Sequence, residues 1–390
     1  MKRDPASPDV PQIMREFADR TGLNPGATPP RRYLWTDAFA VCNFLELFRL
    51  TQDQSWRDQA LRLVDQVHHT LGRHRADDPR SGWISGLSEQ EGELHPTRGG
   101  LRIGKEQNER PPGERPDERR EWDRDGQYYH YLTKWMHALQ RASRVTGEAT
   151  YARWALELAQ AAHERFCYLP AWGGAKRLYW KMSIDLSRPL VPSMGQHDPL
   201  DGLVTCSELQ AAATAFGTVP LPGLHNEIAD LDAICRGQEW GTDDTLGIGG
   251  LLCDASLIVQ LTIGGAFGAA GLLGKVLDAA LLGLELFAAV DTLELPAAHR
   301  LAFRELGLSI GLKGARPLQQ LVEEHAALFG REAALAARLA ALTEYQPLAE
   351  KIESFWLADA NRSAASWTEH REINMVMLAT SLAPEGFLAV

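Results

Sequence analysis

Apolar and polar positions repeat along the first part of the chain in a pattern that predicts pairs of helices joined by short turns. A shift of 95 residues superposes Tyr33 on Tyr128, and the turns TQDQSW and TGEATY match in length. Ser55 and Thr150 are the predicted N-caps of the second helix in each pair. Repeated helical pairs are typical of solenoids and closed rings. The predicted helices of the two pairs span 34–50, 56–73, 126–145 and 151–166.

The two helices of a pair differ in how their apolar residues are distributed. The second helix has one apolar stripe and a charged opposite face, which indicates a surface helix with one buried side. The first helix is apolar nearly all round, with Asn43, Glu46 and Arg49 on one narrow line, which indicates a buried helix. This contrast predicts an inner and an outer ring of helices. The stripe of the second helix is formed by Trp56, Ala60, Leu63, Val64, Val67 and Leu71.

The rest of the chain continues the helical pattern and shows few signs of strands. The number of predicted helices is close to that of a closed ring of six hairpins, so we expect one all-α domain over 31–390 preceded by an N-terminal extension over 1–30. The further predicted helices span 199–216, 224–235, 246–261, 273–293, 299–312, 317–328, 332–342, 346–359 and 369–381.

The segment 83–121 differs from its surroundings. It is rich in Gly, Pro, Arg and Glu and has no helical period. A loop of this length inside a compact domain is usually functional or disordered. We therefore expect a mobile lid over the mouth of a binding site.

Composition and charge narrow the class of protein. Apolar residues make up 45% of the chain, enough for a large core, and the net charge of -11 argues against a nucleic-acid partner. The five cysteines form no CxxC pair and are expected to be reduced core thiols. Residues 1–10 contain no apolar stretch typical of a signal peptide, so a cytoplasmic protein is expected. The apolar segment 257–274 is interpreted as a buried hairpin rather than a membrane span.

Aromatic and titratable residues cluster at the starts of the helices predicted to be inner. If the ring closes, these starts converge on one mouth and form a cup of Trp, Tyr, His and carboxylate side chains. The cluster comprises Tyr33, Trp35, Asp37, Asp123, Tyr128, Tyr129, His130, Trp180, Lys181, His197, Asp201, Trp240, Asp243, Asp244, Trp367 and His370.

Such a cup suits a sugar, because aromatic faces pack against its C–H side and carboxylates bind its hydroxyls. We expect Asp37 and Asp123 to act as acid, base or nucleophile, with Asp201 and Asp244 as the next candidates. The predicted roles of His130, His197 and His370 are to position the sugar or move protons, and the remaining members of the cluster are predicted to bind substrate. Some polar residues have structural interpretations instead: Asp198 before Pro199 suits an N-cap, and His68 and His163 lie on predicted outer helices.

The hairpins whose inner helices start with WTDAF (35–39) and DGQYYHYLTKW (125–135) resemble the superfamily of (α/α)6 toroids. That superfamily includes unsaturated glucuronyl hydrolases, N-acylglucosamine 2-epimerases and many glycosidases. The resemblance covers 30–385 as architecture and implies an all-α (α/α)6 toroid that acts on carbohydrate. It supplies no complete catalytic motif, so the site residues above come from the clustering alone.

The favoured function is a glycoside hydrolase acting on a small sugar or oligosaccharide. The alternatives are a sugar 2-epimerase or isomerase with histidine acid–base chemistry, an isoprenoid-acting enzyme using Asp243 and Asp244, and a non-catalytic helical scaffold. No HExxH or similar spacing is present, and GIGG at 247–250 lacks a preceding strand, so neither a metal nor a cofactor is expected. The expected partner is a small carbohydrate, with no nucleic acid and no membrane; the oligomeric state is left open.

Overall fold

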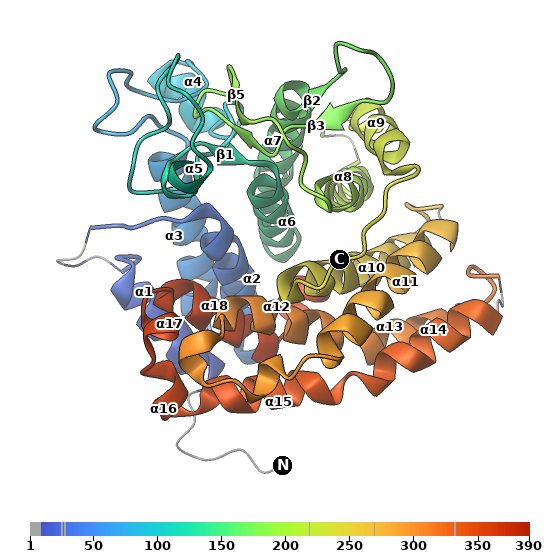
Figure 1. Ribbon diagram of the computed structural model, residues 1–390. Helices are drawn as coiled ribbons and strands as arrows, with labels where there is room; N and C mark the ends of the chain where they lie inside the picture. The colour runs from blue at the N-terminus through green and yellow to red at the C-terminus, as the bar shows by residue number, and fades with distance from the viewer. Residues whose placement is uncertain (1–8, 25, 27–28, 218, 269, 331–332) are drawn as a thin grey trace. The chain divides into compact units, whose positions relative to one another are not determined.

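The computed structural model describes residues 9–24, 26, 29–217, 219–268, 270–330 and 333–390. Most of these residues are α-helical, and the strands among them are two or three residues long (Figure 1). The all-α class expected from the sequence is therefore confirmed. Contacts divide the chain into two compact units, an N-terminal unit formed by Thr21–Phe48 and Asp53–Gln238, and a C-terminal unit formed by Met1–Arg20, Arg49–Gln52 and Glu239–Val390.

The N-terminal unit is built from helical hairpins. The bounds of the second hairpin follow those of the first by 95 residues at all four helix ends, which confirms the predicted repeat. The closure of the hairpins into one ring stays a prediction. The hairpins of this unit are α2 (Leu34–Thr51) with α3 (Gln54–Leu71), α6 (Tyr129–Thr146) with α7 (Ala149–Phe166), and α8 (Asp198–Thr214) with α9 (His225–Cys235).

The inner and outer character of the helices also agrees with the sequence pattern. Every residue of α2 from Leu34 to Leu47 is buried, whereas α3 buries one face. α6 packs against both α7 and α8. The indole Nε1 of Trp135 on α6 donates to Nε2 of His68 on α3 at 3.1 Å. Burial lowers the pKa of His68 to about 3, so it is a neutral acceptor with the structural role expected of it.

Both predicted helix caps are two residues away from the observed ones. Asp53 caps α3 by accepting from the Ser55 amide, and Glu148 occupies the N-cap position of α7. Ser55 and Thr150 therefore lie inside their helices. The reason for the first shift is that Asp53 is also a strong cap former and lies where the chain turns.

The N-terminal unit contains two small sheets, one at the start of α6 and one at the end of α7. The strand order of the first is β1-β4-β5, all antiparallel, and its register places Tyr128 opposite Lys181. The strands are β1 (Gln127–Tyr128), β4 (Lys181–Met182) and β5 (Pro189–Val191) in the first sheet, and β2 (Cys167–Tyr168) and β3 (Arg177–Leu178) in the second.

The segment 83–121 is packed into the N-terminal unit over much of its length. It contains α4 (Glu89–Leu94) and the beginning of α5 (Glu118–Asp123), so the expectation of a segment without helices was wrong. Trp83 and Ile103 are buried, and the Trp83 ring lies directly against Gly92 of α4. These buried side chains anchor the segment, unlike a freely mobile flap. Its role as a lid stays a prediction.

The C-terminal unit has three buried helices, α10, α12 and α18, and α12 packs against both of the others. The predicted helix 332–342 corresponds to α14, and residue 332 lies outside the described residues. The longer helices of this unit are α1 (Val10–Arg20), α10 (Thr245–Ile263), α11 (Ala270–Ala288), α12 (Ala302–Lys313), α13 (Ala315–Glu324), α14 (Ala333–Glu344), α15 (Pro347–Leu357) and α18 (Arg371–Leu382). Its short helices are η1 (Thr292–Glu294), η2 (Ala297–His299), α16 (Asp359–Arg362), α17 (Ala365–Thr368) and α19 (Glu385–Leu388).

Part of the expected N-terminal extension belongs to this unit. α1 packs against α18 and buries Ile13, Met14 and Phe17. Nε of Arg20 donates to Glu372 of α18 at 3.2 Å. The spacing of these apolar residues follows one helical face, which was readable from the sequence.

Among the described residues, α10 alone is long and apolar enough to cross a membrane, and 67% of its most apolar stretch is buried inside the protein. It packs most closely against α12, where glycines face each other. A Cβ added to Gly249 would lie 2.1 Å from the carbonyl oxygen of Gly307. The two backbones can therefore touch only because Gly249 has no side chain. α10 has the burial of a core helix, as the sequence predicted for its second half.

The α10–α12 contact generates a prediction with a matched control on the next residue. Gly249→Ala should lower the free energy of unfolding by roughly 2 kcal/mol, because the new methyl group forces the helices apart. Gly250→Ala should raise it by about 0.5–1 kcal/mol, because no atom lies within 4 Å of its Cβ position and alanine favours the helix. Urea denaturation measures both. Equal effects of the two variants would contradict the close contact.

Candidate active site

Aromatic side chains from the start of α2 and the residue before it, from β1, from α6 and from the residue before β4 form one contiguous cluster in the N-terminal unit. The hydroxyl groups of Tyr33 and Tyr131 are 2.8 Å apart. The Tyr128 ring lies 5.2 Å from the Tyr131 ring and 5.0 Å from the Trp180 ring, and Trp35 contacts Tyr131 at 6.4 Å, all between ring centroids. We call these five residues the aromatic wall. The pairing of β1 with β4 places Trp180 beside Tyr128.

A histidine and a carboxyl group meet beside this wall. His130 lies in the first turn of α6 and Asp198 is the first residue of α8, and Nδ1 of His130 is 3.6 Å from Oδ1 of Asp198. The His130 ring is nearly parallel to the Trp180 ring, with 13° between their planes. The N-cap position of α8 belongs to His197, and Asp198 makes no capping hydrogen bond. The interpretation of Asp198 as an N-cap was therefore wrong.

Burial moves the pKa values of the two groups in opposite directions. It lowers the pKa of His130 to about 4, since the protonated ring loses its hydration. Burial, followed by the nearby charge of Asp201, raises the pKa of Asp198 to about 8. Near pH 7 the pair is therefore a neutral imidazole and a mostly protonated carboxyl group. His130 Nδ1 and Asp198 Oδ2 are both buried without a hydrogen-bond partner among the described residues.

Asp201 holds α8 against α6 next to this pair. Its Oδ1 accepts from Nζ of Lys134 at 2.7 Å, and its Oδ2 accepts from Oγ1 of Thr133 at 2.6 Å. Its charge disfavours ionisation of Asp198, while the Lys134 charge acts in the opposite direction. Asp201 thus lies beside Asp198, where it positions the two helices and influences Asp198, and its predicted catalytic role stays a prediction.

The carboxylate of Asp37 interacts with the two residues that directly precede α2. Its Oδ2 accepts from the Tyr33 amide at 2.9 Å, and its Oδ1 lies 3.5 Å from Nη1 of the buried Arg32. Burial raises the pKa of Asp37 to about 6, with Arg32 opposing the shift. Both oxygens are directed to the chain that precedes the helix, which gives Asp37 a structural role rather than the expected catalytic one.

Three other members of the predicted cluster are also placed differently from expectation. Asp123 is exposed on α5, in a helix before β1 rather than at the start of α6. Tyr129 is buried with its hydroxyl group against Gly202 of α8. Lys181 is buried and its Nζ donates to the carbonyl oxygens of Glu121 and Arg124, at 2.5 and 2.8 Å. Lys181 therefore anchors α5, and its hydrogen bonds leave it unsuited to the predicted contact with substrate.

Five of the predicted residues belong to the C-terminal unit. Asp244 caps α10 by accepting from Gly247 at 3.2 Å and pairs with Arg304 at 2.6 Å, so it has a structural role there. Trp240 and Trp367 are buried, and Trp367 stacks on Trp356. Asp243 is exposed, and His370 occupies the N-cap position of α18. Packing and capping account for Asp244 and Trp367 within this unit.

Sequence reasoning took Tyr131 for a possible core residue and overlooked Lys134 and the chemical role of Asp198. The first two lie in the quoted string DGQYYHYLTKW, and their helical spacing from Tyr128 and His130 could have identified them. Asp198 directly precedes a proline, which is typical of an N-cap, and for that reason it was not predicted to be a catalytic residue. His197 is partly exposed at the N-cap position of α8, where its carbonyl oxygen accepts a hydrogen bond from the backbone amide of Asp201.

No protein-family model matches the chain, and a comparison with curated proteins finds no match. Among solved structures, the chain is similar to a sugar epimerase from a ruminal bacterium, with a TM-score of 0.43 and 10% identity over 80% of this chain and 75% of that one. It is also similar to the cellobiose 2-epimerase from Spirochaeta thermophila DSM 6192, with a TM-score of 0.49 and 14% identity over 96% and 98%. A third is an inactive variant of the α-1,6-mannanase GH76A of Salegentibacter sp. HEL1_6 in complex with α-1,6-mannotriose, with a TM-score of 0.46 and 11% identity over 96% and 98%. At TM-scores below 0.5 these likenesses establish neither a family nor an activity for this chain.

The environment of Asp37 predicts a pH-dependent effect of Asp37→Asn. A raised pKa means that the folded state keeps a proton which the unfolded state has already lost. The wild-type protein should therefore lose stability relative to the variant as the pH rises from about 4 to about 6. The change should be on the order of 2–3 kcal/mol, measured by urea denaturation at both ends of this range.

Asp65→Asn on the exposed side of α3 is the control, and its effect should change by less than about 1 kcal/mol over the same range. A constant difference between wild type and Asp37→Asn would show that Asp37 titrates as an ordinary carboxyl group.

Proposed function

We propose that the chain is a carbohydrate-active enzyme whose acid–base pair is His130 and Asp198. The observation that carries the proposal is the approach of His130 to Asp198, each of which has a buried polar atom that lacks a hydrogen-bond partner among the described residues. Burial lowers the pKa of the imidazole and raises that of the carboxyl group, which favours a neutral base beside a protonated acid near pH 7. Pairs of titratable groups whose pKa values are pushed apart by their surroundings are a common mark of acid–base sites.

The aromatic wall supports a sugar as the substrate. Tyr131 and Trp180 supply partly exposed ring surfaces next to the pair, backed by the buried Tyr128 ring, and such surfaces pack against the C–H face of a pyranose. The hydroxyl groups of Tyr33 and Tyr131 add polar atoms that can bind sugar hydroxyls. The wall thus combines apolar contact with hydrogen-bonding groups, as a sugar requires.

The chemistry that suits this pair best is epimerisation or isomerisation of a reducing sugar in its open-chain form. The neutral His130 ring takes the proton from the carbon next to the carbonyl group, so a C–H bond breaks and an N–H bond forms. Asp198 gives its proton to the carbonyl oxygen, which yields an enediol. Rotation of the enediol about its C2–C3 bond turns the other face of the carbon toward His130, and return of both protons then completes a 2-epimerisation.

A second candidate is glycoside hydrolysis, which the sequence favoured. The protonated Asp198 has the raised pKa of a general acid that donates to a leaving oxygen. The second carboxyl group near it is Asp201, which is held by Lys134 and Thr133 and is thereby a weaker base or nucleophile. For this reason we place hydrolysis after epimerisation.

The proposal predicts the effects of His130→Asn and Asp198→Asn. Each variant should lower kcat by roughly a hundredfold to ten-thousandfold, since amides transfer no protons. The wild-type rate should rise through about pH 4, as His130 loses its proton, and fall through about pH 8, as Asp198 loses its proton. Any activity left in His130→Asn should no longer rise through the acidic limb of the pH–rate profile. Any activity left in Asp198→Asn should no longer fall through its basic limb.

The measurement is incorporation of deuterium from heavy water into a panel of reducing sugars, alongside release of reducing ends from disaccharides. Deuterium in the recovered sugar supports epimerisation, and new reducing ends without it support hydrolysis. His225→Asn, an exposed histidine at the start of α9, is the control and should retain full activity. Full activity in both site variants would place the chemistry elsewhere in the protein.

A further inference from the structure

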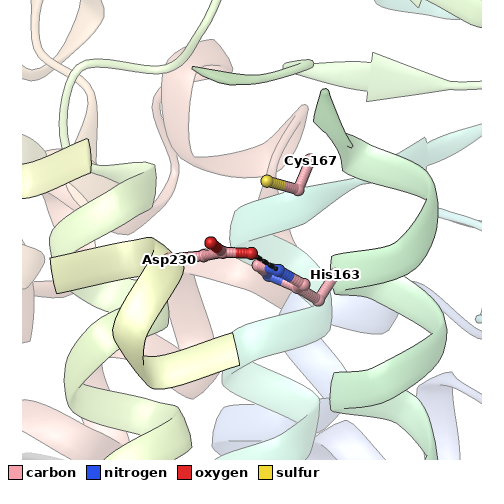
Figure 2. Close-up of side chains that lie close together, drawn as sticks. All are labelled: His163, Cys167 and Asp230. Atoms are coloured by element: carbon pink, nitrogen blue, oxygen red, sulfur yellow. Dashed lines mark hydrogen bonds and ion pairs between the residues drawn. The ribbon is translucent and has the colours of Figure 1, made fainter. Parts of the chain in front are cut away.

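A second group of chemically competent side chains lies in the N-terminal unit, on α7 and α9. Ligand atoms of His163, Cys167 and Asp230 all lie within 4.8 Å of one another. Figure 2 shows the three side chains directed into the same space, two from the end of α7 and one from α9. None of them belongs to the aromatic wall or to the acid–base pair.

The backbone holds these residues in place. His163 lies in the last turn of α7, and Cys167 directly follows that helix, so a spacing of four residues puts both on one face. Cys167 opens β2 and is paired with Leu178 of β3, which fixes the chain as it leaves the helix. Asp230 lies in the middle of α9, and its Oδ2 is 3.0 Å from Nε2 of His163. The arrangement is therefore defined before any ligand binds.

We propose that His163, Cys167 and Asp230 form a binding site for a divalent transition-metal ion, of which Zn²⁺ fits best. A thiolate, an imidazole and a carboxylate are all zinc ligands, and the sulfur ligand disfavours Mg²⁺ and Ca²⁺. Three protein ligands leave one tetrahedral position open for water or another small ligand. The side chains of His163 and Asp230 are 12% and 28% exposed, so an ion can reach them from solvent.

Lys176 is the group with which a metal ion must compete. Its Nζ donates to Oδ2 of Asp230 at 2.5 Å, so an ammonium ion contacts one of the ligand oxygens. Its side chain is 46% exposed and can turn away into solvent. Lys176 also lines a cavity of about 500 Å³ with Trp172, Arg177 and Met194. The site therefore borders open space on the side of Lys176, and loss of this lysine should favour the metal.

The test uses the full chain, purified without metal, and titrates it with Zn²⁺ by calorimetry and with Co²⁺ by absorption spectroscopy. We expect one equivalent of either ion to bind and a cobalt–thiolate charge-transfer band to appear. Cys167→Ser should abolish the band, and Cys167→Ser and Asp230→Asn should each weaken zinc binding by at least about a hundredfold. Lys176→Ala should strengthen it several-fold, because the competing cation is gone.

Cys235→Ser is the matched control, since Cys235 ends α9 and is not part of the group. It should bind zinc as the wild type does. Asp230→Asn changes a partly exposed residue, so it keeps the test usable if Cys167→Ser fails to fold. Absence of the cobalt–thiolate band in the wild type, or full zinc affinity in Asp230→Asn, would overturn the proposal. His130→Asn and Asp198→Asn should bind zinc normally, which separates this result from that of the proposed function.

Discussion

The contact between the N-terminal ends of α6 and α8 is the interaction on which the proposed site depends. Lys134 and Thr133 of α6 hold the Asp201 carboxylate of α8, and this bridge sets Asp198 beside His130. A carboxylate buried between two helices is costly unless it is paired, so the bridge also keeps the helices in register. The charge of Asp201 also disfavours ionisation of Asp198. One carboxylate therefore both holds the two helices together and raises the pKa of the proposed acid.

The aromatic wall extends this arrangement through the short strands. Pairing of β1 with β4 fixes Trp180 next to Tyr128, and the Tyr33–Tyr131 hydroxyl contact joins the start of α2 to that of α6. Each element contributes one or two side chains, and none of them forms a site alone. Three of these rings pack around His130 and contribute to the burial that lowers its pKa.

The residues misjudged from the sequence show where local signals are ambiguous. Asp37 and Asp198 both stand near the first turn of an inner helix, where a carboxylate can satisfy free amide groups or face a ligand. Asp37 accepts from Tyr33 and pairs with Arg32, whereas Asp198 makes no cap and faces His130. The difference lies in the residues contributed by neighbouring segments, which no local pattern contains.

The sequence by itself determined the helices, the 95-residue repeat and the burial of α2 against the half-burial of α3, because these follow from periodicity within about twenty consecutive residues. It also determined that aromatic and titratable residues gather at the starts of inner helices. Only the tertiary structure decided which of them meet. His130 and Asp198 are far apart in the chain, and Asp230 comes to His163 from another hairpin. Proximity across hairpins depends on packing between helices, and packing is a property of the folded chain.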